Sequence, residues 1–94
     1  MPIIEIRIIS LIQYEVEDLG KTRKCYRGTI CVPYGEASSN VDVSFFYNST
    51  NNDSIKAIDE KSGWIYFFDD RVVIDSIEEG DLFQVEIKKI QKDI

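Results

Sequence analysis

The chain has 94 residues, 44% of them hydrophobic, with a formal net charge of −6 and no histidine. This composition predicts one globular domain, residues 1–94, because the apolar content exceeds that of chains kept disordered by their charge. A net-negative surface repels phosphate backbones, so the charge disfavours general binding of nucleic acids.

No stretch approaches the roughly 20 apolar residues that cross a bilayer. Glu5 and Arg7 also interrupt the first apolar run, where a signal peptide would be continuous. We therefore expect a cytoplasmic protein that does not contact membranes. Cys25 and Cys31 should be free thiols, because extended backbone between them separates their Cα atoms too far for a disulfide.

The first element predicted is a long strand over residues 3–17. Its even positions carry Ile4, Ile6, Ile8, Ser10, Ile12, Tyr14 and Val16, and most odd positions are polar. Alternation with period two predicts a strand. The odd positions turn apolar at Ile9 and Leu11, which is typical of a strand that curls and is covered on both sides in a barrel. Residues 18–21, with Gly20, predict a turn.

A second strand is predicted over residues 22–34. One face carries Tyr26, Ile30 and Val32, and the other carries Arg23, Cys25, Arg27, Thr29 and Cys31. Gly28 in the middle indicates a bulge or bend, and Pro33 should end the pairing. We expect a polar loop over 35–40, then a third strand over 41–47 that alternates in the same way.

The middle of the chain is less clear. Residues 48–54 form the most polar run and predict a loop. Residues 55–61 fit either a short helix capped by Ser54 or a strand, and we favour the helix slightly. Residues 64–75 predict a hairpin, with strands over 64–68 and 71–75 and a turn at Asp69 and Asp70.

The last predicted strand follows a turn at Glu79 and Gly80 and directs Phe83, Val85 and Ile87 inward. The pattern from Ile77 through Gly80 and Asp81 to Val85 resembles the glycine-aspartate turn of cradle-loop barrels and the strand entries of SH3-like and OB barrels. In all, the chain predicts a mainly β fold, a small antiparallel barrel or sandwich of about six strands with room for one short helix.

The chain lacks the residues that several kinds of catalytic and binding site require. Without histidine, the chain has no Cys-His or Ser-His nucleophile and no ordinary proton shuttle near neutral pH. The cysteines lack the spacing of a zinc site, and no glycine-rich phosphate loop occurs. We therefore expect no enzymatic activity, no cofactor and no metal.

Acidic and aromatic residues form the first candidate contact surface. The densest negative charge includes Asp69, Asp70, Glu78 and Glu79. These carboxylates are either solvated tips that protect strand edges or a face that binds a basic partner. Trp64 and Tyr66 alternate with Ile65 in a stretch that is apolar on both faces. One face should be core, and the other, with Phe46, is either internal as well or a partner patch.

Basic residues form an alternative site. Arg7, Arg23 and Arg27 with Tyr26 resemble the cationic groove and stacking ring of an OB surface that binds single strands. The competing interpretation is that these cations pair with Glu5, Glu15 and Glu17 across the first hairpin.

The sequence thus predicts a non-enzymatic protein-interaction module that binds a basic partner surface. Its size and charge suit a small inhibitor, immunity or accessory protein of a virus or mobile element. One alternative is a module for single-stranded nucleic acid or another anionic ligand. Another is a homo-oligomer in which residues 19–35, with net charge +4, meet residues 36–87, with net charge −9.

Overall fold

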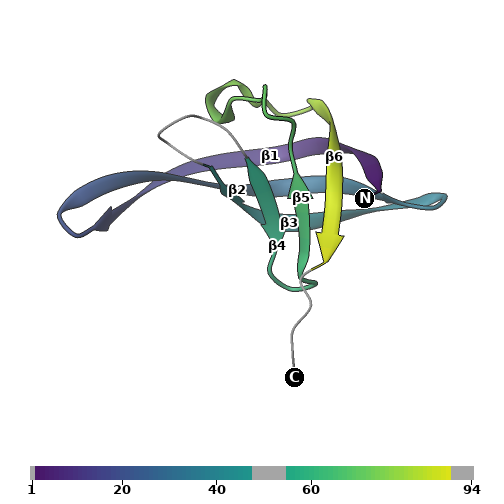
Figure 1. The fold of residues 1–94 in the computed structure, drawn as a ribbon, viewed down its shortest axis with the longest axis horizontal. Helices are drawn as coiled ribbons and strands as arrows, with labels where there is room; N and C mark the ends of the chain where they lie inside the picture. Colours follow the sequence, from purple (N-terminus) through teal and green to yellow (C-terminus); the bar gives the residue numbers. More distant parts are fainter. Residues whose placement is uncertain (1, 48–54, 90–94) are drawn as a thin grey trace.

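A computed structural model describes residues 2–47 and 55–89. These residues form a closed antiparallel barrel in which each strand pairs with the next and the last pairs with the first (Figure 1). The elements are β1 (Ile3–Asp18), β2 (Lys21–Tyr34), β3 (Ala37–Phe46), β4 (Lys56–Asp59), β5 (Trp64–Phe67), the 3₁₀ helix η1 (Ile74–Ser76) and β6 (Leu82–Lys89). The mainly β barrel is therefore confirmed. The expected loop at 48–54 lies outside the described residues.

The core fills the barrel with the inward residues of all six strands and with residues beside η1. Ile6, Ile8, Ile30, Ile55 and Val85 are the most deeply buried large side chains. Alternation explains most of this set, because every second residue of a paired strand faces the same side. The inward positions expected in the second, third and last strands are those that the barrel buries or half-buries.

A β-bulge in β1 changes which residues face the core. Ile8 pairs with Ile30 and Ser10 pairs with Thr29, so Ile9 is an extra residue without its own partner. Even-numbered residues face inward before the bulge, whereas odd-numbered residues share the inner side after it. The expectation that all even positions of the first strand lie on one face is therefore wrong beyond Ile9.

Gly28 lies beside this bulge. A Cβ at Gly28 would collide with the carbonyl oxygen of Ser10 and lie 3.2 Å from the Cα of Leu11. The irregularity expected at Gly28 is thus present, but the inserted residue belongs to β1, and glycine in β2 makes room for it.

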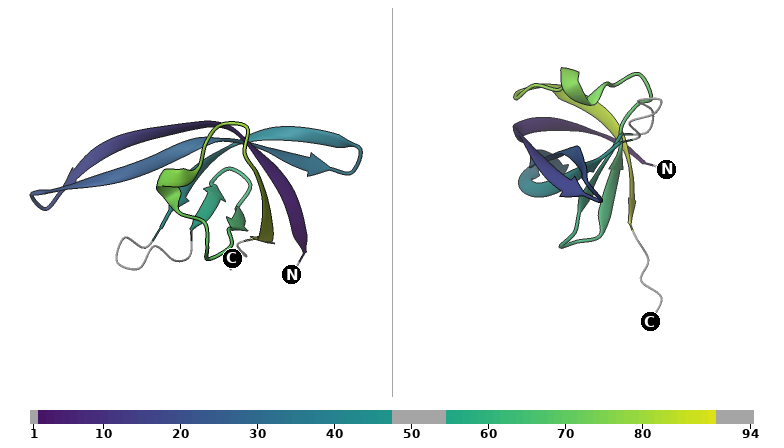
Figure 2. Two further views of the ribbon diagram at one scale, coloured as in Figure 1. Left: turned by 90° about the horizontal axis from the view of Figure 1, so that it is seen from above. Right: turned by 90° about the vertical axis from the view of Figure 1, so that its left-hand side faces the viewer.

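Beyond the bulge, β1 and β2 continue as a two-stranded hairpin arm, residues 13–26. Its turn has positive φ at Leu19 (52°) and Gly20 (75°), as a tight hairpin turn requires. β3 pairs with β2 only from Tyr26 onward, so the arm projects from the barrel. Figure 2 shows this arm and the β2–β3 hairpin extending in opposite directions.

The β2–β3 hairpin is longer than the sequence indicates. Pro33 pairs with Ser38 and Tyr34 pairs with Ala37, so the strands meet at a two-residue turn and no loop spans 35–40. Pro33 does not end the ladder, because β1 pairs with β2 only as far as Cys31 and leaves an open edge beside the proline.

Two expectations for the second half are wrong. Lys56–Asp59 is a strand and not a helix, because it pairs with β3 on one side and with β5 on the other. Trp64–Phe67 pairs with β4 and β6, so it forms no hairpin with 71–75. In the register, Tyr66 lies opposite Ala57 of β4 and Ile87 of β6, so its backbone is paired with a strand on each side.

Residues 69–81 form a cap segment over one end of the barrel. The Asp69 side chain accepts hydrogen bonds from the backbone N–H and the guanidinium of Arg71, which turns the chain locally. η1 follows, and Ile74 and Ile77 insert into the core. This apolar anchoring explains why the segment closes the barrel end instead of forming a strand.

Candidate functional site

The bulge creates an exposed apolar and basic surface on the hairpin arm. Ile12, Tyr14 and Val16 are 50, 40 and 43% exposed, respectively. They lie directly opposite Arg27, Cys25 and Arg23 in the register. Since opposite residues of an antiparallel pair share a face, these six side chains form one surface, which we name the outer arm face.

Among the described residues, the arginines of the outer arm face have no carboxylate partner. The Arg27 guanidinium carbon lies 5.6 Å from the centre of the Tyr14 ring, within reach of a cation–π contact. Within residues 2–47 and 55–89, the single ion pair joins Arg71 to Asp69. The expected pairing of these arginines with Glu15 and Glu17 is wrong, because the bulge in β1 moves the two glutamates to the opposite face of the arm.

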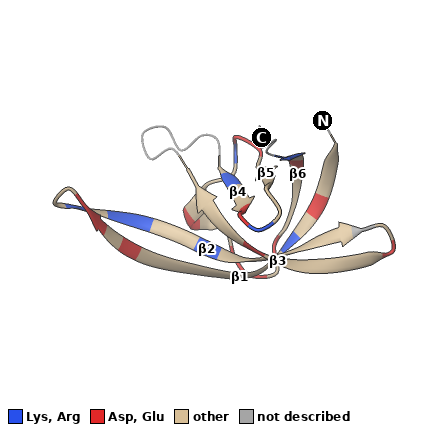
Figure 3. Ribbon diagram, turned by 90° about the horizontal axis from the view of Figure 1, so that it is seen from below, with Lys and Arg blue, Asp and Glu red and all other residues tan. Residues whose placement is uncertain are grey.

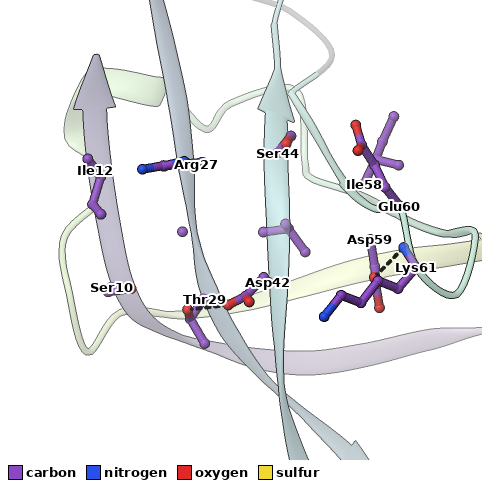
Figure 4. Close-up of a pocket in the computed structure, with 12 residues that line it drawn as sticks. Ser10, Ile12, Arg27, Thr29, Asp42, Ser44, Ile58, Asp59, Glu60 and Lys61 are labelled. Carbon is purple, nitrogen blue, oxygen red and sulfur yellow. Dashed lines mark hydrogen bonds between the residues drawn. The ribbon is translucent and has the colours of Figure 1, made fainter.

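A groove crosses the outer side of β1, β2 and β3 beside the arm (Figure 4). One depression of about 400 Å³ includes Ser10, Arg27 and Lys61. A second of about 720 Å³ includes Tyr14 and Phe46. Ser44 and Glu60 line both, so the two depressions adjoin, and together we name them the outer groove.

The outer groove is most basic at its arm end. Arg23, Lys24 and Lys56 line the larger depression, and Glu60 is the one carboxylate among its described lining residues. Figure 3 shows the basic residues following β2 along the arm. Phe46 (42% exposed) and Tyr14 add aromatic surface to this end. An acidic protein thus carries a locally positive, partly aromatic groove.

The carboxylates at the other end of the groove already have partners. Asp42 accepts a hydrogen bond of 2.9 Å from the Thr29 hydroxyl. Asp59, the buried polar residue of the core, accepts hydrogen bonds from the N–H of Lys61 (3.0 Å) and the hydroxyl of Ser62 (2.8 Å). These two carboxylates therefore stabilise the sheet and the β4–β5 turn.

The predicted acidic surface lies on the cap segment and is partly engaged. Arg71 donates hydrogen bonds of 2.9 and 3.2 Å to the two oxygens of Asp69. This contact lowers the pKa of Asp69 to about 2. Asp70, Glu78 and Glu79 are exposed, and the Glu78 backbone N–H binds the Asp81 carboxylate at 2.9 Å.

The predicted aromatic patch does not form one surface. Tyr66 is only 3% exposed and belongs to the core, so it is not available to a partner. Trp64 lies on the same inward side, is half-buried, and has the Lys89 ammonium 5.7 Å from its ring centre. Phe46 points to the opposite side of the sheet, into the outer groove.

The alternative anion site is only partly assembled. Arg23 and Arg27 share the outer groove. Arg7 lies before the bulge, where it pairs with Cys31 and Leu82, and it does not line the outer groove. Tyr26 is buried, and its hydroxyl donates a hydrogen bond of 2.6 Å to Asp75 Oδ1. That bond, with burial, raises the pKa of Tyr26 to about 12.

Tyr14 and Lys56 are among the groove residues that the sequence analysis did not predict. Tyr14 takes the exposed position expected of Tyr26, because the bulge exchanges the two faces of β1. The apolar pair Ile9 and Leu11, read together with Gly28, is the signal that could have revealed the exchange. Lys56 carries no such signal, because its position depends on β4 pairing with the end of β3.

Over the described ranges, no helix is long and apolar enough to cross a bilayer, and no group of three potential metal ligands comes together. Comparison with known proteins finds no matching family model, no similar curated protein and no similar solved structure. The candidate site therefore depends on its geometry alone.

Proposed function

We propose that the protein is a non-catalytic interaction module that binds an acidic, partly apolar segment of another protein in the outer groove. The observation that carries this proposal is the joint exposure of Arg23 and Arg27 with Ile12, Tyr14 and Val16 on one face, where the described part of the chain offers the two arginines no carboxylate partner. Exposed apolar surface beside uncompensated charge is typical of contact sites.

The aliphatic side chains favour a protein over a nucleic acid as the partner. Ile12 and Val16 offer branched apolar surface that packs against aliphatic or aromatic side chains, whereas bases bind mainly by stacking on rings. The net charge of −6 also repels a phosphate chain at a distance, although the groove itself is basic.

The sequence pointed to a basic partner on the acidic cap segment, and the geometry supports that surface less. Asp69 already forms an ion pair with Arg71, and Asp75 accepts a hydrogen bond from the Tyr26 hydroxyl. The remaining carboxylates of this surface are exposed to solvent: Asp70, Glu78 and Glu79. A role as an inhibitor, immunity or accessory protein of a virus or mobile element stays a prediction from size and charge.

The groove is tested with a defined probe, a fluorescent 12-residue peptide that alternates glutamate and leucine. We expect saturable binding, detected by fluorescence anisotropy, that weakens as salt rises. The double variant Arg23→Glu, Arg27→Glu should lose about tenfold or more in affinity, because both substitutions reverse charges in the groove. Arg7→Glu is the matched control, since Arg7 is exposed on the same strand pair but outside the groove.

Equal loss in the Arg7→Glu control would assign the binding to total charge and would contradict the proposal. Binding of the peptide in which lysine replaces glutamate, with similar affinity, would also contradict it.

A second candidate is a single-stranded nucleic acid. Its specific support is the Arg27–Tyr14 cation–π pair beside the exposed Phe46 ring, since rings and arginines together bind unstacked bases. A 12-nucleotide oligo-dT distinguishes the two. Tight binding that falls steeply with salt would favour nucleic acid, because each phosphate contact releases a counterion.

A further inference from the structure

We propose that two copies of the chain associate through the outer edge of β1, so that their hairpin arms form one continuous four-stranded sheet. The partner is a second copy of this chain, related by a two-fold axis near Tyr14. This association goes beyond the proposed function, because it uses the backbone edge of the arm and leaves the outer groove open.

The outer edge of β1 is unpaired over most of its length. β6 pairs with β1 only from Ile3 to Arg7. The backbone N–H of Ile8 donates to Asp81 O (2.9 Å), and the Ile8 oxygen accepts from the Gly80 N–H (2.7 Å). From Ser10 to Asp18, no strand of the described chain covers this side. Nine residues thus offer an open edge, the usual template for strand addition.

The backbone groups of the edge are correctly spaced for a ladder. Asp18 and Lys21 flank a two-residue turn, so the polar groups of Asp18 and of every second residue before it face β2. The groups of Leu11, Gln13, Glu15 and Glu17 consequently face the open side. Such an alternating row can pair with an antiparallel copy of itself.

The open edge is self-complementary when the axis passes through Tyr14. Residues 10–18 then pair fully with their own copy, with Tyr14 opposite Tyr14 and Ile12 opposite Val16. A two-fold interface requires this reciprocity, in which residue i meets j and j meets i. On the outer arm face, the central cross-strand pairs, Tyr14 with Tyr14 and Ile12 with Val16, are apolar and stabilise antiparallel pairing, and Ser10 lies opposite Asp18 at each end.

The opposite face of the arm also accepts this register. Glu15 would lie opposite Gln13, and Glu17 opposite Leu11, so no carboxylate faces another carboxylate directly. An axis through Glu15 would instead place two glutamates directly opposite each other, which destabilises a sheet. Charge thus disfavours an axis through Glu15, and the register centred on Tyr14 is the one that pairs the whole open stretch with its own copy.

The tip of the second arm would be directed at the Gly80–Asp81 turn, because this turn occupies the β1 edge next to the open stretch. Lys21 of the tip would approach Glu78 and Glu79, which flank the turn, whereas Asp18 would lie opposite Ser10. The charges at the ends of the interface are therefore mixed, and the pairing depends on the open backbone edge and on the apolar pairs.

The first test measures association by sedimentation velocity from about 1 to about 100 μM, since a dimer depends on protomer concentration. We expect the wild type to dimerise and Ile12→Glu and Val16→Lys each to raise the dissociation constant about tenfold or more. The double variant Ile12→Glu, Val16→Lys should restore dimerisation, because the new carboxylate of one copy faces the new ammonium of the other.

Circular dichroism of each variant checks that the barrel is intact. A wild type that remains monomeric throughout this range would overturn the proposal, as would a double variant no better than its parents. The peptide-binding experiment tests the outer groove, whereas sedimentation tests the open edge of β1. Either proposal can therefore fail while the other holds.

The second test locates the axis with a single cysteine. In a background of Cys25→Ser and Cys31→Ser, Tyr14→Cys should form a covalent dimer under mild oxidation, because the two copies of this residue face each other. Val16→Cys is the matched control, since residue 16 faces residue 12 of the other copy. Equal cross-linking of the two variants would show that the register is wrong.

Discussion

Tyr26 shows how one side chain links the arm to the cap segment. Its ring is buried against the barrel, it meets the Tyr47 ring edge-on at a centroid distance of 5.7 Å, and its hydroxyl binds Asp75. The bond joins β2 to η1 across 49 positions of sequence. A residue that looked like a stacking ring in the sequence therefore has a structural role.

We expect Tyr26→Phe to lower the free energy of unfolding by about 1 to 2 kcal/mol at pH 7, since it removes a hydrogen bond to a charged acceptor. Urea unfolding measures this difference. Tyr47→Phe is the control, because the Tyr47 hydroxyl donates to a neutral carbonyl, that of Lys24, and its loss should cost less. Equal losses would contradict the assignment.

The same bond predicts a pH dependence. The pKa of Tyr26 is raised to about 12 in the folded protein, so the folded state holds the phenolic proton more tightly than the unfolded chain. The stabilisation is fully present below a pH of about 10 and is lost as the pH rises towards 12. The difference between wild type and Tyr26→Phe should therefore shrink over this interval.

Gly28 is the second residue on which the fold depends. We expect Gly28→Ala to destabilise the protein by about 2 kcal/mol or more, because the added carbon would force the β1 backbone away from β2 at the bulge. Gly35→Ala is the matched control. Its Cβ would meet nothing within 4 Å, so only the backbone strain of its positive φ (58°) remains, about 1 kcal/mol. Thermal unfolding should rank the two variants in this order.

At the scale of elements, the hairpin arm is separable from the barrel. No residue between 15 and 24 belongs to the buried core, and the arm has neighbouring strands only near its base. A two-stranded ribbon of this kind contributes little stability of its own. The barrel therefore does not depend on the arm, whose exposed side chains are free to make the contacts proposed above.

We expect the arm to be removable without loss of the fold. Replacing residues 15–24 with Asn-Gly, a sequence suited to a two-residue turn, should change the free energy of unfolding by less than about 1 kcal/mol. The same variant should be monomeric in sedimentation velocity. A large fall in the unfolding midpoint would show that the arm supports the barrel.

At the scale of the whole molecule, local alternation predicted the barrel well. β1, β2, β3 and β6 were predicted close to their observed positions, because each is long enough for a period of two to be read. β4 and β5 have only four residues each, and their identity depends on partners distant in the sequence. Pairing with β6, and not the local apolar pattern, decides that Trp64–Phe67 does not fold back on 71–75.

The candidate site was less predictable than the fold. Arg23 and Arg27 were recognised from charge alone, but their neighbours on the surface depend on a single inserted residue, Ile9. An insertion of one residue moves every later side chain of a strand to the other face. Tyr14 and Tyr26 exchanged roles for this reason, and no count of charges or rings could reveal it.

The closure of the barrel by β6 also sets the order of events during synthesis. Five of the six strand pairings join consecutive strands, and the sixth joins the first strand to the last. While the ribosome is still making the second half of the chain, Ile4 and Ile6 lack their pairing partners, Val85 and Phe83. The barrel therefore stays open at this edge of β1. The nascent polypeptide therefore exposes one unpaired edge of its first strand until the final strand emerges, a period in which a neighbouring nascent chain competes for the same backbone.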